Sequence, residues 1–136
     1  MGAWGVLAFD NDQACDWAAG LKKVNDLSLV MRAFAGVGAS DDDEYLDADK
    51  ATKALAACEV LARLKGNPGY KNPYTQDVDA WVAAHPMEVV PGIIVRADAV
   101  IDRVLGDQSE LRQLWDEGDA AEWRQAVEDL RRRLRG

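Results

Sequence analysis

Carboxylates dominate the side chains of this sequence that could do chemistry. Asp10, Asp12 and Asp16 are spaced closely near the start of the chain. Their oxygens could hold a hard divalent cation, which could activate water for hydrolysis. The same residues also suit the start of a helix, because acidic and Asx side chains stabilise helix N-termini. The spacing lacks the glycine and distal glutamate of a calcium loop, so a helix start is the favoured interpretation and a metal site the alternative.

Other groups that could catalyse a reaction are few. The chain has one histidine, His85, and two cysteines, Cys15 and Cys58. The histidine precedes a proline at a predicted helix end, where histidine usually caps the helix or lies on the surface. The cysteines fall on apolar helix faces and are expected to be reduced, buried thiols. No phosphate loop, dinucleotide-binding glycine pattern, zinc site or nucleophile elbow occurs, so we expect no cofactor and favour a protein that is not an enzyme.

The charge of the chain restricts its partners. It carries 24 acidic and 16 basic residues in 136, a formal net charge of −8. This disfavours nucleic acid, whose phosphates need a basic surface, and suits a basic protein partner. No apolar run is long enough to span a membrane, and no basic segment precedes the apolar residues at the N-terminus. We therefore expect a cytoplasmic protein without membrane contact.

Two segments are candidates for a contact surface. Residues 41–44, which include Asp42 and Asp43, are a run of four acids between two predicted helices. Tyr70 and Tyr74 lie in a stretch rich in glycine, proline and asparagine, which is expected to be a loop. The tyrosines could fold back onto the core or line a binding surface. Trp4, between two glycines near the start of the chain, is a further candidate binding residue and could also anchor the terminus by burial.

The elements that must position these residues are all helical. Apolar residues recur at helical spacing, and no alternating strand pattern is long enough to be assigned. The helices are expected at about residues 12–22, 27–37, 47–65, 75–85, 88–105, 109–117 and 119–134. The sequence predicts one all-α domain over residues 1–136, a compact bundle of six or seven helices with an N-terminal leader packed against it. The segment 88–105 is the most apolar of these helices and is expected at the centre of the bundle. The protein could be a monomer or a small homo-oligomer.

The opening of the chain also carries a resemblance. Residues 1–5, with the sequence Met-Gly-Ala-Trp-Gly, precede Phe-Asp-Asn-Asp at 9–12 and Asp16-Trp17. The later Ser109-Glu110-Leu111, Leu114-Trp115 and Glu122-Trp123 fit the same pattern. With these motifs the chain resembles a family of small, mostly bacterial proteins catalogued as domain of unknown function 4259. The resemblance covers nearly the whole chain and implies no activity, substrate or catalytic residue.

These observations lead to two hypotheses for function. The leading one is a non-catalytic, acidic, cytoplasmic binding or protein-interaction domain. Its contact surface would join the acids at 41–44 to the loop of Tyr70 and Tyr74. The alternative is a small metal-dependent hydrolase or metal-binding protein that uses Asp10, Asp12 and Asp16.

Overall fold

The computed structural model describes residues 5–38 and 45–136, so Trp4, Asp42 and Asp43 lie outside the described residues. The described part is all-α and has no sheet, which confirms the predicted fold class. Two short 3₁₀ helices, Gly20–Lys23 and Pro73–Thr75, accompany the α-helices. The α-helices are α1 (Asp12–Ala19), α2 (Ser28–Gly38), α3 (Ala48–Leu64), α4 (Gln76–Ala84), α5 (Pro91–Leu105), α6 (Glu110–Asp116) and α7 (Ala120–Arg135).

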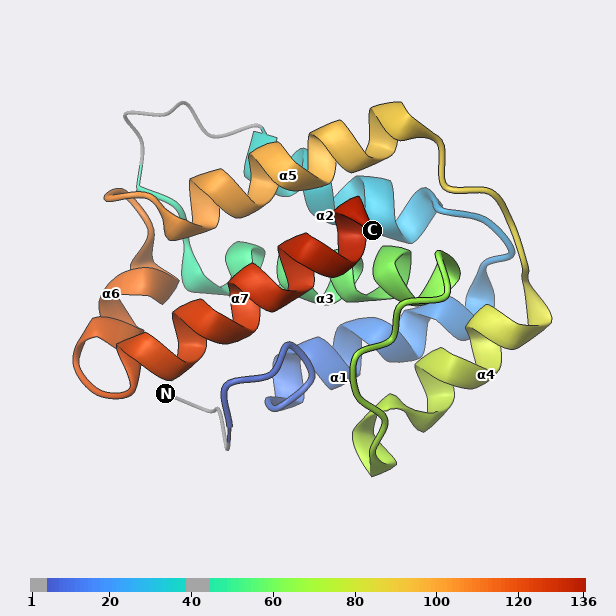
Figure 1. The fold of residues 1–136 in the computed structure, drawn as a ribbon, viewed down its shortest axis with the longest axis horizontal. Coiled ribbons are helices and arrows are strands. Elements are labelled where there is room, and N and C mark those ends of the chain that lie inside the picture. Colours follow the sequence, from blue (N-terminus) through green and yellow to red (C-terminus); the bar gives the residue numbers. More distant parts are fainter. Residues whose placement is uncertain (1–4, 39–44) are drawn as a thin grey trace.

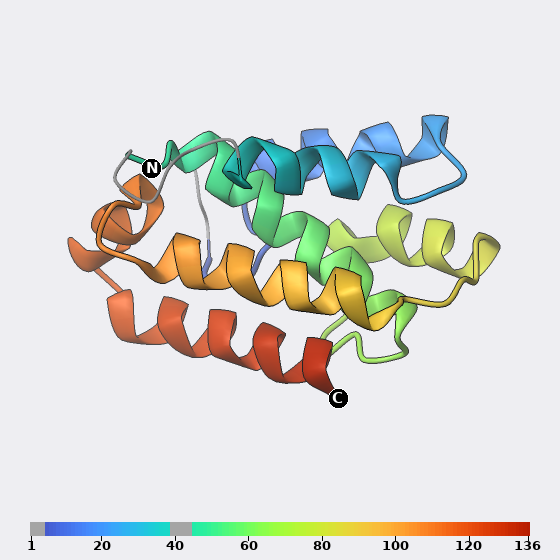
Figure 2. The ribbon, with the colours of Figure 1, turned by 90° about the horizontal axis from the view of Figure 1, so that it is seen from above.

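The central element is α3, and not the helix at 88–105 that we predicted. Figure 2 shows α3 running through the middle of the molecule, and it contacts each of the other six α-helices. Every residue from Ala54 to Arg63 is buried. Because several of these residues are alanines, neighbouring helices can approach the axis closely. α5 instead lies on the outside, where Val95 is 70% exposed, because high apolar content alone does not decide which helix is enclosed.

The described part of the leader packs against the bundle, as predicted. Phe9 is completely buried, and the Asp10 carboxylate accepts a hydrogen bond from the backbone N–H of Leu7 at 3.1 Å. A Cβ on Gly5 would lie 2.3 Å from an Asp10 oxygen, so a side chain at position 5 would displace this carboxylate from the turn. Asn11 caps α1 by accepting from the N–H of Ala14 at 2.7 Å. The cap of α1 is thus this asparagine and not one of the neighbouring aspartates, Asp10 and Asp12.

A short backbone bridge ties the start of α3 to the start of α6. The N–H of Leu46 donates to Gln108, and the carbonyl of Leu46 accepts from Glu110 at 2.9 Å. The Glu110 side chain in turn accepts from the N–H of Ala48, in the first turn of α3. These contacts bring two helix N-termini and their acidic residues to the same end of the molecule.

The predicted boundaries differ from the observed ones mainly at helix starts. α5 begins at Pro91 rather than near residue 88, because proline is favoured in the first turn of a helix and its backbone is preorganised for it. Ser109 caps α6 by accepting from the N–H of Arg112, so this helix begins at Glu110, one residue later than expected. No helix of the described residues is long and apolar enough to cross a membrane.

Candidate functional site

The described residues form a groove of about 420 Å³ that is lined by apolar side chains and carboxylates, and this groove is the candidate site. It lies between the leader, the first turn of α1, α3, α6 and α7. Cavities of this size are typical of small-ligand pockets. We call it the leader groove, and the residues that define it are Gly5 to Ala8, Asn11 to Gln13, Ala48, Asp49, Thr52, Leu55, Glu59, Glu110, Leu111, Leu114, Trp115, Trp123, Ala126, Val127, Leu130 and Arg133.

Apolar side chains form most of the groove walls. Trp115 of α6 and Trp123 of α7 stack with their ring centroids 6.1 Å apart and their planes 8° from parallel. Both tryptophans are buried, as are Leu55 on α3 and Leu130 on α7. This contact fixes α6 against α7 and gives the groove a rigid apolar side. One side of the groove is therefore formed by tightly packed aromatic rings.

Three carboxylates line the groove where the helices begin. Asp12 lies in the first turn of α1, Asp49 in the first turn of α3 and Glu110 in the first turn of α6. None of the three is in an ion pair within the part of the chain that the structure describes. Two of them, Asp12 and Asp49, are exposed. This rim presents negative charge to solvent.

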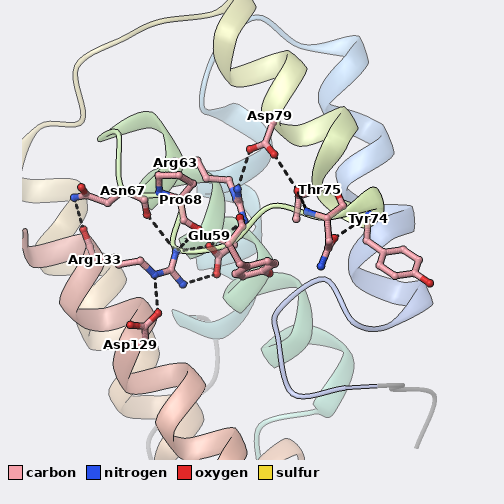
Figure 3. A network of polar contacts seen from close by, with 11 residues as sticks. Glu59, Arg63, Asn67, Pro68, Tyr74, Thr75, Asp79, Asp129 and Arg133 are labelled. Carbon is pink, nitrogen blue, oxygen red and sulfur yellow. Dashed lines mark hydrogen bonds and ion pairs between the residues drawn. The ribbon is translucent and has the colours of Figure 1, made fainter.

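A buried ion pair lies at the other end of the groove. The Glu59 carboxylate receives two hydrogen bonds from the Arg133 guanidinium, at 2.6 and 3.0 Å (Figure 3). Glu59 is 1% exposed, and the Arg133 side chain is 12% exposed. The Nε of Arg133 donates to Asp129 at 2.9 Å, and its Nη1 also donates to the carbonyls of Asn67 and Pro68. The carboxylates hold the pKa of Arg133 above its usual range despite the cost of burial.

A second arginine continues this network towards α4. Arg63 donates to Asp79 at 2.8 Å and to the carbonyl of Tyr70 at 2.8 Å (Figure 3). Its guanidinium lies 4.8 Å from the centre of the Tyr70 ring. The Asp79 carboxylate also accepts from the Thr75 hydroxyl at 2.9 Å. The network therefore joins α3, α4, α7 and the loop after α3.

The predicted acidic site separates into different environments. The Asp10 carboxylate is used in the leader turn, Asp12 lines the groove, and Asp16 is exposed on α1. Among the described residues no group of three or more His, Cys, Asp or Glu side chains could hold a metal ion. Burial and the three acids raise the pKa of the Cys15 thiol. No observation on these residues favours the hydrolase alternative.

The two loop tyrosines have different surroundings. Tyr70 folds back over Arg63, and burial, followed by the charge of Glu59, raises the pKa of its phenol. Tyr74 is 49% exposed. The loop with these tyrosines follows the C-terminal end of α3, whereas Tyr45 comes just before its N-terminal end. Since a helix of 17 residues is about 25 Å long, Tyr45 and the loop lie at opposite ends of α3. The acids at 41–44 lie outside the described residues, so the structure does not place them relative to this loop.

The remaining reactive groups are engaged or enclosed. His85 lies 2.8 Å from the carbonyl oxygen of Trp81 and 3.2 Å from the side-chain oxygen of Asn25, and it stacks on the Trp81 ring. Both cysteines are free, and burial of Cys58 raises its pKa above the usual range for a thiol. None of these groups lines the leader groove.

The sequence analysis did not single out Glu59 or Arg133. One signal was available, because Glu59 and Arg63 are four residues apart within a stretch of α3 made mainly of alanine, leucine and valine. A charged residue on an apolar face needs a buried partner. Its partner, Arg133, is 74 residues away and could not be identified from local spacing.

Comparison with known proteins identifies a family but no function. Neither a curated protein nor a solved structure matches the chain. A family model described as "Domain of unknown function (DUF4259)" matches residues 2–126, which is most of the chain. The match includes the leader, α3, α6 and the first part of α7, and so nearly all of the groove. The chain therefore belongs to the family with that domain of unknown function, DUF4259.

Proposed function

We propose that this protein is a non-catalytic cytoplasmic binding domain whose leader groove holds a basic segment of a protein partner. One observation carries the proposal: the groove combines apolar walls with acidic groups that are not neutralised within the described residues. Four carboxylates and one guanidinium line it, so its net charge is negative. A positively charged partner complements both the groove and the whole chain, whose net charge is −8.

The pairing of the basic side chains on α7 supports a positively charged partner over a negatively charged one. Arg131 donates to Asp102, Arg135 donates to Asp98 at 2.8 Å, and Arg133 is held by Glu59. These arginines already have carboxylate partners within the chain. The three acids of the groove rim form no ion pair with the described residues, so an incoming cation would compete only with the hydrogen bond from the N–H of Ala48 to Glu110.

The surroundings of the reactive residues support a non-catalytic role. A nucleophile needs an adjacent base and access to substrate. Cys58 is fully buried, and His85 is held between Trp81 and Asn25, away from the groove. The groove itself brings together carboxylates, amides and apolar side chains, which suit binding.

Selection from a displayed library of random peptides tests the proposal without requiring the natural partner to be identified. We expect the peptides that bind the purified protein to be enriched in lysine and arginine. Their binding should weaken as salt is raised from about 50 to 500 mM, because ions screen exposed charges. A library depleted of basic residues serves as the matched control. Selection of neutral or acidic peptides, or binding that does not depend on salt, would contradict the proposal.

A further inference from the structure

We infer that the leader groove selects a bulky apolar side chain that carries, or directly neighbours, a positive charge. This inference rests on the proposed function and specifies the chemistry of the segment that binds. The apolar part would lie between Leu55, Leu111 and Val127, and the cation would stay at the rim with Asp12, Asp49 and Glu110. In a protein partner, an aromatic residue next to lysine or arginine has this chemistry.

The shape of the groove sets the orientation of the ligand. Asp49 at the rim and Glu59 at the far end are ten positions apart on α3, which is about 15 Å along a helix axis. The length between them is lined by apolar residues such as Leu55 and Val127. A charge placed among these side chains would lose its hydration without compensation. The apolar end must therefore enter first, and the charge must remain near the exposed carboxylates.

The hydrogen bonds of Arg133 argue against a preference of the groove for anionic ligands. An anionic ligand would need a free guanidinium in the groove, and Arg133 is the basic residue that lines it. All three of its nitrogens already donate hydrogen bonds, two of them to Glu59 and the third to Asp129. An incoming carboxylate would have to displace this buried pair, which is costly. The groove therefore discriminates by charge at its rim and by apolar volume inside.

Three indole compounds of nearly equal shape test this inference. Tryptamine is a cation, tryptophol is neutral and indole-3-propionate is an anion. Each is titrated into ¹⁵N-labelled protein, and the backbone amide shifts of groove residues such as Leu55 and Leu111 are followed. We expect tryptamine to shift these amides at millimolar concentration, and we expect binding of the anion to be about tenfold weaker or lost.

Charge variants identify the residues responsible. The double variant Asp12→Asn, Asp49→Asn should reduce the preference for tryptamine over tryptophol, because only Glu110 then remains charged at the rim, while both compounds still enter the groove. The matched control is Asp26→Asn, because Asp26 is exposed and lies outside the groove. Circular dichroism of each variant checks that the helices are retained.

The outcomes separate this inference from the proposed function. Equal binding of the three compounds, or preference for the anion, would overturn the inference whatever the peptide selection shows. No shift of groove amides together with selection of basic peptides would also overturn it, and would place the basic contact elsewhere on the protein. Selection of non-basic peptides would overturn the proposed function, even if tryptamine enters the groove.

Discussion

At the scale of single residues, the most unusual feature is the carboxylate that is enclosed between two arginines. Glu59 is 1% exposed, accepts two hydrogen bonds from Arg133 and lies 3.6 Å from Arg63. Buried charges cost free energy unless each has a well-placed partner. The ion pair therefore fixes the position of α7 along α3, because each buried charge is tolerated only while its partner is present.

We expect Glu59→Gln to lower the free energy of unfolding by about 3–5 kcal/mol, since it leaves two enclosed guanidinium groups without their shared carboxylate. Urea denaturation measures this change. The matched control is Asp129→Asn, which removes a carboxylate from the same Arg133 at a site 49% exposed and should cost about 1 kcal/mol or less. Equal losses in the two variants would show that burial of Glu59 does not determine its contribution.

At the scale of elements, the loop after α3 depends on glycine for two different reasons. Gly66 has φ of 86° and ends α3 in the left-handed conformation. Gly69 has φ of 65°, and a Cβ there would lie 2.6 Å from Nε of Arg133. The loop thus passes directly over the arginine whose charge it helps to satisfy through the carbonyls of Asn67 and Pro68.

Gly69→Ala and Gly36→Ala should change stability in opposite directions. At Gly69 the added methyl group meets both backbone strain and the guanidinium, and we expect a loss of about 1–3 kcal/mol in the free energy of unfolding. Gly36 lies inside α2, and a methyl group added there would meet no atom within 4 Å, so alanine should add up to about 1 kcal/mol through its helix propensity. Thermal and urea unfolding measure both. A stabilising Gly69→Ala would mean that the loop does not depend on this close approach.

At the scale of the whole molecule, one central helix joins all the parts. α3 contacts each of the other six α-helices, and the ion network links it to α4 and α7 (Figures 1 and 3). The leader is tied in by the completely buried Phe9. Since no helix can leave without exposing part of α3, we expect the chain to unfold as one unit.

Unfolding should therefore be a single transition when it is followed by two independent probes. Far-ultraviolet circular dichroism reports the helices. Tryptophan fluorescence reports the five tryptophans together, which include Trp17 in α1, Trp81 in α4, Trp115 in α6 and Trp123 in α7. We expect the two urea curves to coincide, as two-state behaviour requires. Separate midpoints would indicate that part of the bundle unfolds independently and would contradict the prediction of one domain over 1–136.

Local sequence was sufficient to determine the helices and most of their ends. Apolar periodicity and stop residues such as Gly66 act within a few positions, so the all-α class and the packed leader could be predicted. Exact starts were harder, as at Pro91, because several neighbouring residues could begin the helix.

Only the tertiary structure decided which helix is central and which side chains form the groove. Glu59 and Arg133 meet across 74 positions, and the rim brings together Asp12, Asp49 and Glu110 from three different helices. Helical periodicity indicates which face of each helix is apolar, but it does not specify which helices face one another. That choice depends on the packing of complete helices and on pairing every buried charge, and both require the whole chain to be folded.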